Sequence, residues 1–186
     1  PYNSPVEALN MFTVDLASRS PVAGIQTDFS VRGSNYESVA VNLDGLKIND
    51  PQTGHHNSDI PLTKYDLEAI EVIPNLEKIN FRSKKPQGKF RVLELIIGGY
   101  GTKGVTLSFS QELKNLNIRF SLEDLESSGF KDDTDFRKTT ATLSSLYKFS
   151  GNEFKLNFGF LEKEFGAYDF YTPGRDFPSR EWTKTY

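Results

Sequence analysis

His55 and His56 are the residues of this chain best suited to chemistry, because imidazole can transfer a proton or bind a metal near neutral pH. Both lie in residues 49–57, NDPQTGHHN, a segment rich in turn-forming residues. Adjacent histidines on a loop seldom point at one centre, and no third ligand has suitable spacing, so neither a metal nor a cofactor is expected. Packing of the loop, or contact with a large ligand, is favoured instead. The candidate contacts for such a ligand are Asp50, Gln52, His55, His56 and Asn57.

A second polar cluster, Asp132, Asp133 and Asp135, has the side chains that Ca²⁺ prefers. It lacks the glycine and the terminal glutamate of an EF-hand loop, so a solvated acidic loop is the favoured interpretation. The chain has two histidines and no cysteine, and its sequence contains no Ser/His/Asp or Cys/His grouping and no glycine-rich phosphate loop. These observations predict a protein that is not an enzyme.

Composition excludes several further classes of protein. The chain has 186 residues, a net charge of −3 and no cysteine. Without an excess of positive charge, nucleic acid is not an expected partner. The absence of cysteine excludes a disulfide framework and thiol chemistry. No apolar run approaches the roughly 20 residues that a membrane-spanning helix requires.

Short strands and tight turns are the elements expected to position residues 49–57. Alternating apolar residues predict strands at residues 29–31 and 39–43 and a further arm at residues 46–48. Arg32-Gly33 and Asp44-Gly45 are the expected turns, because glycine accepts the positive φ that tight hairpin turns require. The other elements expected in this part of the chain are a capped helix at residues 4–12, strands at residues 15–18, 69–73 and 79–83, and one helical turn at residues 62–67.

Residues 89–186 differ from residues 1–88 in both composition and pattern. They hold 18 of the 24 aromatic residues, and their apolar and polar residues alternate with a period of two. The runs are about ten residues long and are joined alternately by short turns and long polar loops, as in strands that cross an outer membrane. A soluble antiparallel sandwich has the same period, but the spacing and the aromatic residues near strand ends favour the membrane. Two domains are therefore expected, residues 1–88 and 89–186.

Residues 28–61 carry a specific family resemblance. Arg32-Gly33 after a short strand, Leu43-Asp44-Gly45, residues 49–57 and a closing Ile60-Pro61 together resemble the plug domain of TonB-dependent outer-membrane receptors, in the branch that includes cobalamin transporters. The resemblance implies a mainly β fold, with a small mixed α+β plug domain followed by antiparallel strands of an outer-membrane β-barrel. Because plugged transporters close about 22 strands, the chain is expected to be a fragment of a larger receptor.

The resemblance also implies a function at the cell outer membrane. That function is active transport of a scarce large solute, which is cobalamin, a ferric siderophore or another metal chelate. The implied partners are this solute, outer-membrane lipid and a TonB-type energy transducer of the inner membrane. Tyr168 and Tyr171, in an outer loop, are candidate ligand contacts, because flat aromatic surface suits a large ligand.

Four residues are expected to be structural plug motifs, namely Arg32, Gly33, Asp44 and Gly45. Arg32 is expected to be a buried charge that pairs with carboxylates of the barrel wall, in preference to a contact with the solute. Asp44, like Asp50, is expected at a turn for backbone reasons alone.

The sequence departs from the family pattern after Ile73. Plug domains continue into Arg-Gly-Pro and a Gly-Gly-Val-Ile-Asn strand, whereas this chain continues Pro74-Asn75-Leu76-Glu77. Either the segment is trimmed in this protein or residues are omitted here. Two other classes of function stay open, a soluble periplasmic binding module and a passive porin or adhesin barrel. The second of these would have no globular plug.

Overall fold

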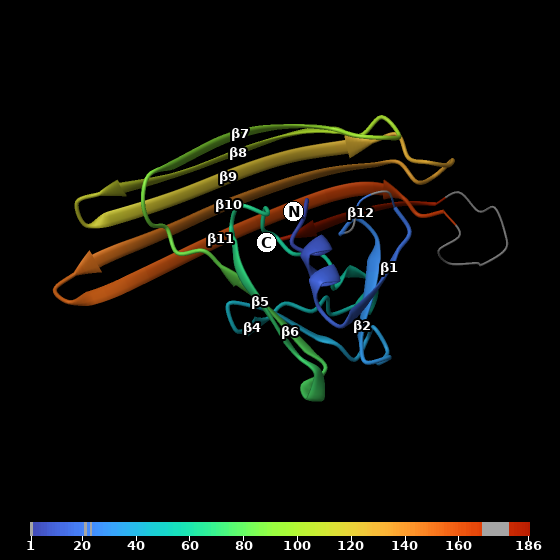
Figure 1. Cartoon of the computed structure of the whole chain (residues 1–186), viewed down its shortest axis with the longest axis horizontal. Helices are drawn as coiled ribbons and strands as arrows, with labels where there is room; N and C mark the ends of the chain where they lie inside the picture. Colours follow the sequence, from blue (N-terminus) through green and yellow to red (C-terminus); the bar gives the residue numbers. More distant parts are fainter. Residues whose placement is uncertain (1, 21, 23, 169–178) are drawn as a thin grey trace.

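A long, curved antiparallel sheet dominates the computed structural model, which describes residues 2–20, 22, 24–168 and 179–186 (Figure 1). Its six strands pair in chain order, so β7 and β12 form the two edges. Short turns join β8 to β9 and β10 to β11 at what we call the short-turn end, and the other connections lie at the opposite, loop end. The strands are β7 (Phe90–Ile97), β8 (Lys103–Leu113), β9 (Leu116–Ser127), β10 (Phe136–Phe149), β11 (Asn152–Gly166) and β12 (Arg180–Thr185).

The N-terminal unit, which comprises the described residues up to Ser83, lies against the concave face of this sheet (Figure 1). It contains a four-stranded sheet in the order β4-β3-β6-β5 and a two-stranded sheet of β1 and β2. Only β3 and β6 pair in parallel among the described strands. The elements are η1 (Glu7–Met11), β1 (Val14–Ser18), β2 (Thr27–Val31), β3 (Ala40–Leu43), β4 (Leu46–Lys47), η2 (Gly54–His56), β5 (Leu67–Ile73), η3 (Pro74–Leu76) and β6 (Lys78–Ser83).

Two apolar clusters hold these parts together. The larger one lies within the N-terminal unit and includes Leu9, Ile79 and Phe81, all completely buried. The smaller one joins the unit to the loop end of the sheet, where Ile25 packs with Phe165 and its neighbours. The N-terminal unit therefore has a core of its own and a limited apolar contact with the six-stranded sheet.

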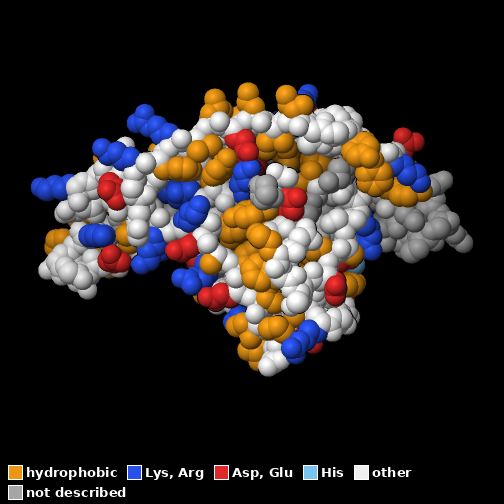
Figure 2. All heavy atoms as spheres, in the orientation of Figure 1, with side chains coloured by type: hydrophobic (Ala, Val, Ile, Leu, Met, Phe, Trp, Pro, Cys, Tyr) orange, Lys and Arg blue, Asp and Glu red, His pale blue; other side chains and the backbone are white. Residues whose placement is uncertain are grey.

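The six-stranded sheet has the opposite polarity to a sheet of a soluble protein. Along the middle of the strands the outward side chains are mostly apolar and exposed, as in Leu95 at 73% and Phe158 at 54%. The inward side chains are mostly polar and buried, as in Thr106 and Ser121, which have no exposed surface. The strand register places Leu143 beside Phe158, so the outward apolar residues form one continuous band. Figure 2 shows such apolar side chains projecting from the convex surface of the sheet.

Most of the strands predicted from apolar alternation are confirmed, and the chain turns at both predicted positions. Asp44 and Gly45 have φ values of 51° and 87° and connect the antiparallel strands β3 and β4. Arg32 and Gly33 also have positive φ, but β2 before them and β3 after them belong to different sheets. The helical turn predicted at residues 62–67 is a single hydrogen-bonded turn and not a helix: Asp66 N–H donates to the carbonyl of Thr63 at 3.0 Å, the Asp66 carboxylate accepts from the N–H and Oγ1 of Thr63, and β5 begins at the next residue.

The expected fold class is wrong. It combined a plug domain containing α-helices with strands of an outer-membrane barrel of about 22 strands. The described residues contain no α-helix, only three short 3-10 segments, and the helix predicted at residues 4–12 is the five-residue η1. Ser4 does accept a hydrogen bond from Glu7 N–H at 3.0 Å, but Phe12 is already extended, so a cap alone does not give a longer helix. The larger sheet is open, with six strands, and is too small for such a barrel.

Candidate functional site

Loop 49–57 is held in shape by its own polar side chains. Asp50 Oδ1 accepts hydrogen bonds from the backbone N–H groups of Gln52 and Thr53 at 2.8 and 2.9 Å. Asn57 is buried, and its Oδ1 accepts a hydrogen bond from Asp50 N–H at 3.1 Å. Gly54 lies so close to a neighbouring segment that a Cβ atom there would be 2.9 Å from a backbone carbon. Asp50 and Asn57 are therefore structural, and Gln52 is the predicted contact whose side chain is exposed.

His55 belongs to a polar chain inside the N-terminal unit. Its Nδ1 lies 2.8 Å from Asp28 Oδ1, and its Nε2 lies 3.1 Å from the hydroxyl of Tyr36, on which the imidazole ring stacks. Because a carboxylate only accepts, Nδ1 is the nitrogen that carries the proton in a neutral ring, and Nε2 then accepts from Tyr36. Burial raises the pKa of Tyr36, and the carboxylates of Glu37 and Asp28 raise this pKa further, so the hydroxyl remains a donor. The arrangement orients His55 but supplies no nucleophile.

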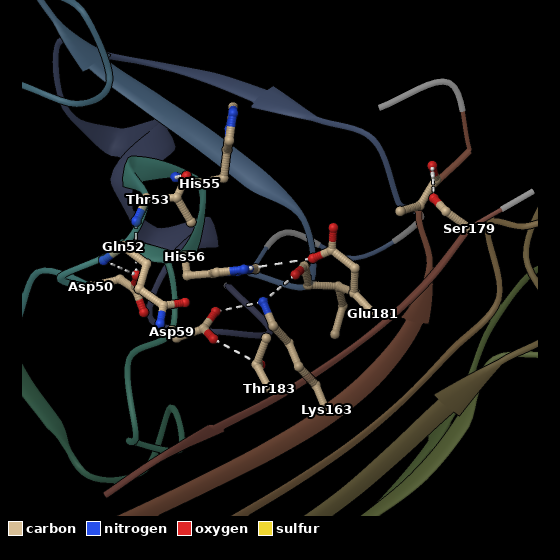
Figure 3. Close-up of polar contacts among 12 residues, drawn as sticks. Asp50, Gln52, Thr53, His55, His56, Asp59, Lys163, Ser179, Glu181 and Thr183 are labelled. Carbon is tan, nitrogen blue, oxygen red and sulfur yellow. Dashed lines mark hydrogen bonds and ion pairs between the residues drawn. The ribbon is translucent and has the colours of Figure 1, made fainter. Parts of the chain in front are cut away.

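His56 points in a different direction and connects the loop to the six-stranded sheet (Figure 3). Its Nε2 lies 3.6 Å from Glu181 Oε2, on β12. Beside this contact, Asp59 pairs with Lys163 of β11 and accepts a hydrogen bond from Thr183 Oγ1 at 3.0 Å. The two adjacent histidines thus face different partners. The described residues contain no group of three or more His, Cys, Asp or Glu side chains that could hold a metal ion.

Tyr168 lies just after β11 and is tied to the loop between β9 and β10. Lys131 Nζ donates a hydrogen bond to its hydroxyl and lies 3.6 Å from the centre of its ring. The backbone N–H of Tyr168 donates to the carbonyl of Asp133 at 3.1 Å. These contacts bring two connections at the loop end together. Tyr171, the other predicted aromatic contact, lies outside the described residues.

The role predicted for Arg32 is wrong. Its side chain is exposed, and Nη1 donates to Asn75 Oδ1 at 2.9 Å within the N-terminal unit. The turn that contains Arg32 lies beside η3, the part of the unit farthest from the six-stranded sheet in Figure 1, so the guanidinium does not reach that sheet. Asp44 makes the contact instead: its carboxylate accepts from Ser83 Oγ at 2.6 Å and lies 3.2 Å from Lys155 Nζ of β11. In this contact the N-terminal unit supplies the carboxylate and the sheet supplies the base, which is the reverse of the predicted pairing.

A buried polar contact between the unit and the sheet, centred on Asp66, was not predicted from the sequence. Asp66 accepts hydrogen bonds from Arg119 Nε at 3.0 Å, Ser121 Oγ at 2.7 Å and Thr142 Oγ1 at 2.8 Å, all from strands of the sheet. A signal for this contact was present. Arg119 occupies a polar position in an alternating strand, and a buried charge at such a position requires a partner of opposite charge. The partner itself, one aspartate in a short turn, has no distinguishing pattern.

Comparison with known proteins leaves the function to be inferred from geometry. No protein-family model matches the chain, and no curated protein matches it in sequence. Among the described residues, no helix has the length and apolar character needed to cross a membrane. The positions of the polar contacts, the polarity of the sheet and the resemblance of residues 28–61 are therefore the grounds for a function.

Proposed function

We propose that this chain takes part in active uptake of a scarce large solute across the cell outer membrane. The solute is cobalamin, a ferric siderophore or another metal chelate, and a TonB-type transducer in the inner membrane supplies the energy. The observation that carries this proposal is the reversed polarity of the six-stranded sheet. An apolar outward face suits lipid, and a polar inward face suits a separately folded unit that is displaced during transport.

The outward face favours a lipid environment on energetic grounds. Apolar surface in water costs about 25 cal/mol for each Å², which is why soluble sheets bury their apolar face. Contact with acyl chains removes this cost. Short turns at one end and longer loops at the other are also typical of strands in outer-membrane proteins.

The inward face favours a unit that can be displaced. Asp44, Asp59 and Asp66 of the N-terminal unit are paired with Lys155, Lys163 and Arg119 of the sheet. When such an interface opens, water replaces its hydrogen bonds, so the net loss per hydrogen bond is only about 1 kcal/mol. An apolar interface of the same extent would lose its whole burial energy. A mostly polar interface between the N-terminal unit and the sheet therefore suits a displacement of the unit that is driven by external energy.

The lipid part of the proposal is tested with Trp182, the single tryptophan of the chain. Trp182 is 60% exposed on the outward face of β12. We expect phosphatidylcholine vesicles with brominated acyl chains to quench its fluorescence when the full chain is added. A detergent-free, monodisperse monomer that shows no quenching would contradict the proposal and indicate a soluble binding module.

The transport part is tested in cells that lack the gene and in the same cells with the gene restored. We expect restoration to increase accumulation of labelled cobalamin or of a labelled ferric siderophore, and removal of the inner-membrane transducer to abolish the increase. Unchanged accumulation of every solute class tested would contradict the transport function. Accumulation that does not depend on the transducer would indicate a passive pore.

A further inference from the structure

The two ends of the six-stranded sheet differ in how their charges are balanced. At the loop end, the outward-facing bases of the described strands each have a carboxylate partner within 3.5 Å. These pairs are Lys103 with Glu126, Arg137 with Asp124, Arg180 with Glu164 and Lys184 with Glu162. The outward surface at the loop end is therefore close to neutral.

The short-turn end carries a surplus of positive charge, because four lysines there face, among the described residues, only the carboxylates of Glu112 and Glu153. Lys85 and Lys148 share a single carboxylate, that of Glu153, at 3.9 and 3.5 Å. Lys89 and Lys114 are exposed, and no ion pair of either is found within the described residues. Figure 2 shows lysine and arginine side chains gathered at the left, which is the short-turn end in the orientation of Figure 1.

The apolar band of the outward face extends to this same end. Leu113 and Phe154, next to the two short turns, are 48% and 62% exposed. Tyr147 and Phe149 are also exposed, and their rings stack with centroids 6.4 Å apart. Exposed aromatic rings bordered by lysines are typical of the boundary between acyl chains and headgroups, because a lysine places its stem on apolar surface and its ammonium in the polar layer.

We propose that the short-turn end binds the phosphate groups of an anionic glycerophospholipid leaflet. This inference rests on the proposed function, because it requires the outward face to be covered by lipid. The four lysines (Lys85, Lys89, Lys114 and Lys148) are spread over the linker before β7, the turn between β8 and β9 and the last turn-proximal residues of β10. A leaflet presents many phosphates in one plane, which suits this spread, whereas a single soluble phosphate would meet only one or two of the four.

The test compares binding of the full chain to phosphatidylcholine vesicles with and without phosphatidylglycerol. We expect tighter binding to the anionic vesicles at low salt, with the difference lost at high salt because ions screen the attraction. In the double variant Lys89→Gln, Lys114→Gln, binding to anionic vesicles should weaken by about five-fold for each lysine removed. The matched control, Lys103→Gln with Lys184→Gln, removes the same charge at the loop end and should change binding less than either single short-turn variant.

Each alternative outcome identifies a different error. Equal binding to both kinds of vesicle, or equal weakening in the two double variants, overturns this inference and leaves the proposed function standing. Competition by soluble glycerol phosphate that removes the preference for anionic vesicles indicates a discrete phosphate site and also overturns it. Failure to bind either kind of vesicle overturns the proposed function and, with it, the inference.

Discussion

At the scale of single residues, the side chains of loop 49–57 have two different roles. Some hold the loop in shape, and one is available to a ligand. Gln52 is exposed, whereas Asn57 is buried and bonded to Asp50. We expect Gln52→Ala to weaken solute binding several-fold and to change stability by less than about 0.5 kcal/mol. Asn57→Ala should lower stability by about 1–3 kcal/mol, because it leaves a buried N–H group unpaired. Solute affinity and urea unfolding, measured on both variants, distinguish the two roles, and a large loss of stability in Gln52→Ala would contradict this assignment.

Asp66 is a buried carboxylate of the N-terminal unit whose ion-pair partner, Arg119, lies in the six-stranded sheet. Asp66→Asn leaves the buried guanidinium of Arg119 without a counter-charge, which typically costs about 3–5 kcal/mol. Chemical unfolding measures this loss. The matched control is Glu71→Gln, because Glu71 pairs with Arg82 at 3.2 Å where both side chains are about half exposed. Water screens that pair, so Glu71→Gln should lower the free energy of unfolding much less. Equal losses of stability in the two variants would contradict the role of Asp66 in holding the unit on the sheet.

At the scale of elements, the turn between β3 and β4 makes a contact with the sheet that depends on pH. Burial alone would raise the pKa of Asp44, but the hydrogen bonds from Ser83 and the ammonium of Lys155 outweigh burial and lower this pKa. The contact therefore contributes stability above the unfolded-state pKa of about 3.9, and this contribution is lost as pH falls through the lower folded-state pKa.

We expect Asp44→Asn to flatten the dependence of stability on pH in the acidic range, below about pH 4. Chemical unfolding at a series of pH values measures the slope. Asp15→Asn, at an exposed position of β1, is the control and should leave the slope as it is in the unaltered protein. An unchanged slope in Asp44→Asn would show that the turn makes no pH-dependent contact.

Strand β11 approaches the backbone of the N-terminal unit closely at Gly159. A Cβ atom there would lie 2.7 Å from the carbonyl oxygen of Pro61, so Gly159→Ala must push the unit away from the sheet. Overpacking of this kind costs about 1–3 kcal/mol. Gly99→Ala is the control, because a Cβ atom at Gly99 meets nothing within 4 Å. Hydrogen exchange of the buried residues around Pro61 should quicken only in Gly159→Ala, and identical exchange in the two variants would contradict the close approach.

Local pattern predicted the strands well because a period of two is itself the signature of a sheet with two unlike faces. It did not predict which strands pair: β2 and β3 are consecutive, yet they lie in different sheets, and β3 pairs in parallel with the distant β6. Partner choice depends on packing between segments far apart in the chain, which no window of neighbouring residues contains. The same limit explains the failure for Arg32, whose surroundings are set by η3, and for Asp66, whose partners lie more than fifty residues away.

At the scale of the whole molecule, the surface that contacts the N-terminal unit and the outward apolar band are the two faces of the six-stranded sheet. Each strand alternates between them, so a slip of one residue in any register would bury apolar residues against the unit and expose serine and threonine outside. The inward ion pairs oppose such a slip, since each base meets its carboxylate in only one register. The inward ion pairs thus help to fix the strand register and, with it, the outward position of the apolar residues. Both faces must be present for the sheet to keep this register.

The outward band gives the most direct test of where the whole molecule resides. Leu143 lies in the middle of the band, between Phe120 and Phe158 on the neighbouring strands. If acyl chains cover this face, Leu143→Arg should weaken folding into phosphatidylcholine vesicles by about 2–4 kcal/mol, whereas Gln111→Arg, on the same face near the short-turn end, should cost about 0–1 kcal/mol. Urea titration followed by the fluorescence of Trp182 measures both costs. Equal costs would mean that depth in a bilayer does not distinguish the two positions, and the outward band would then require a protein partner in place of lipid.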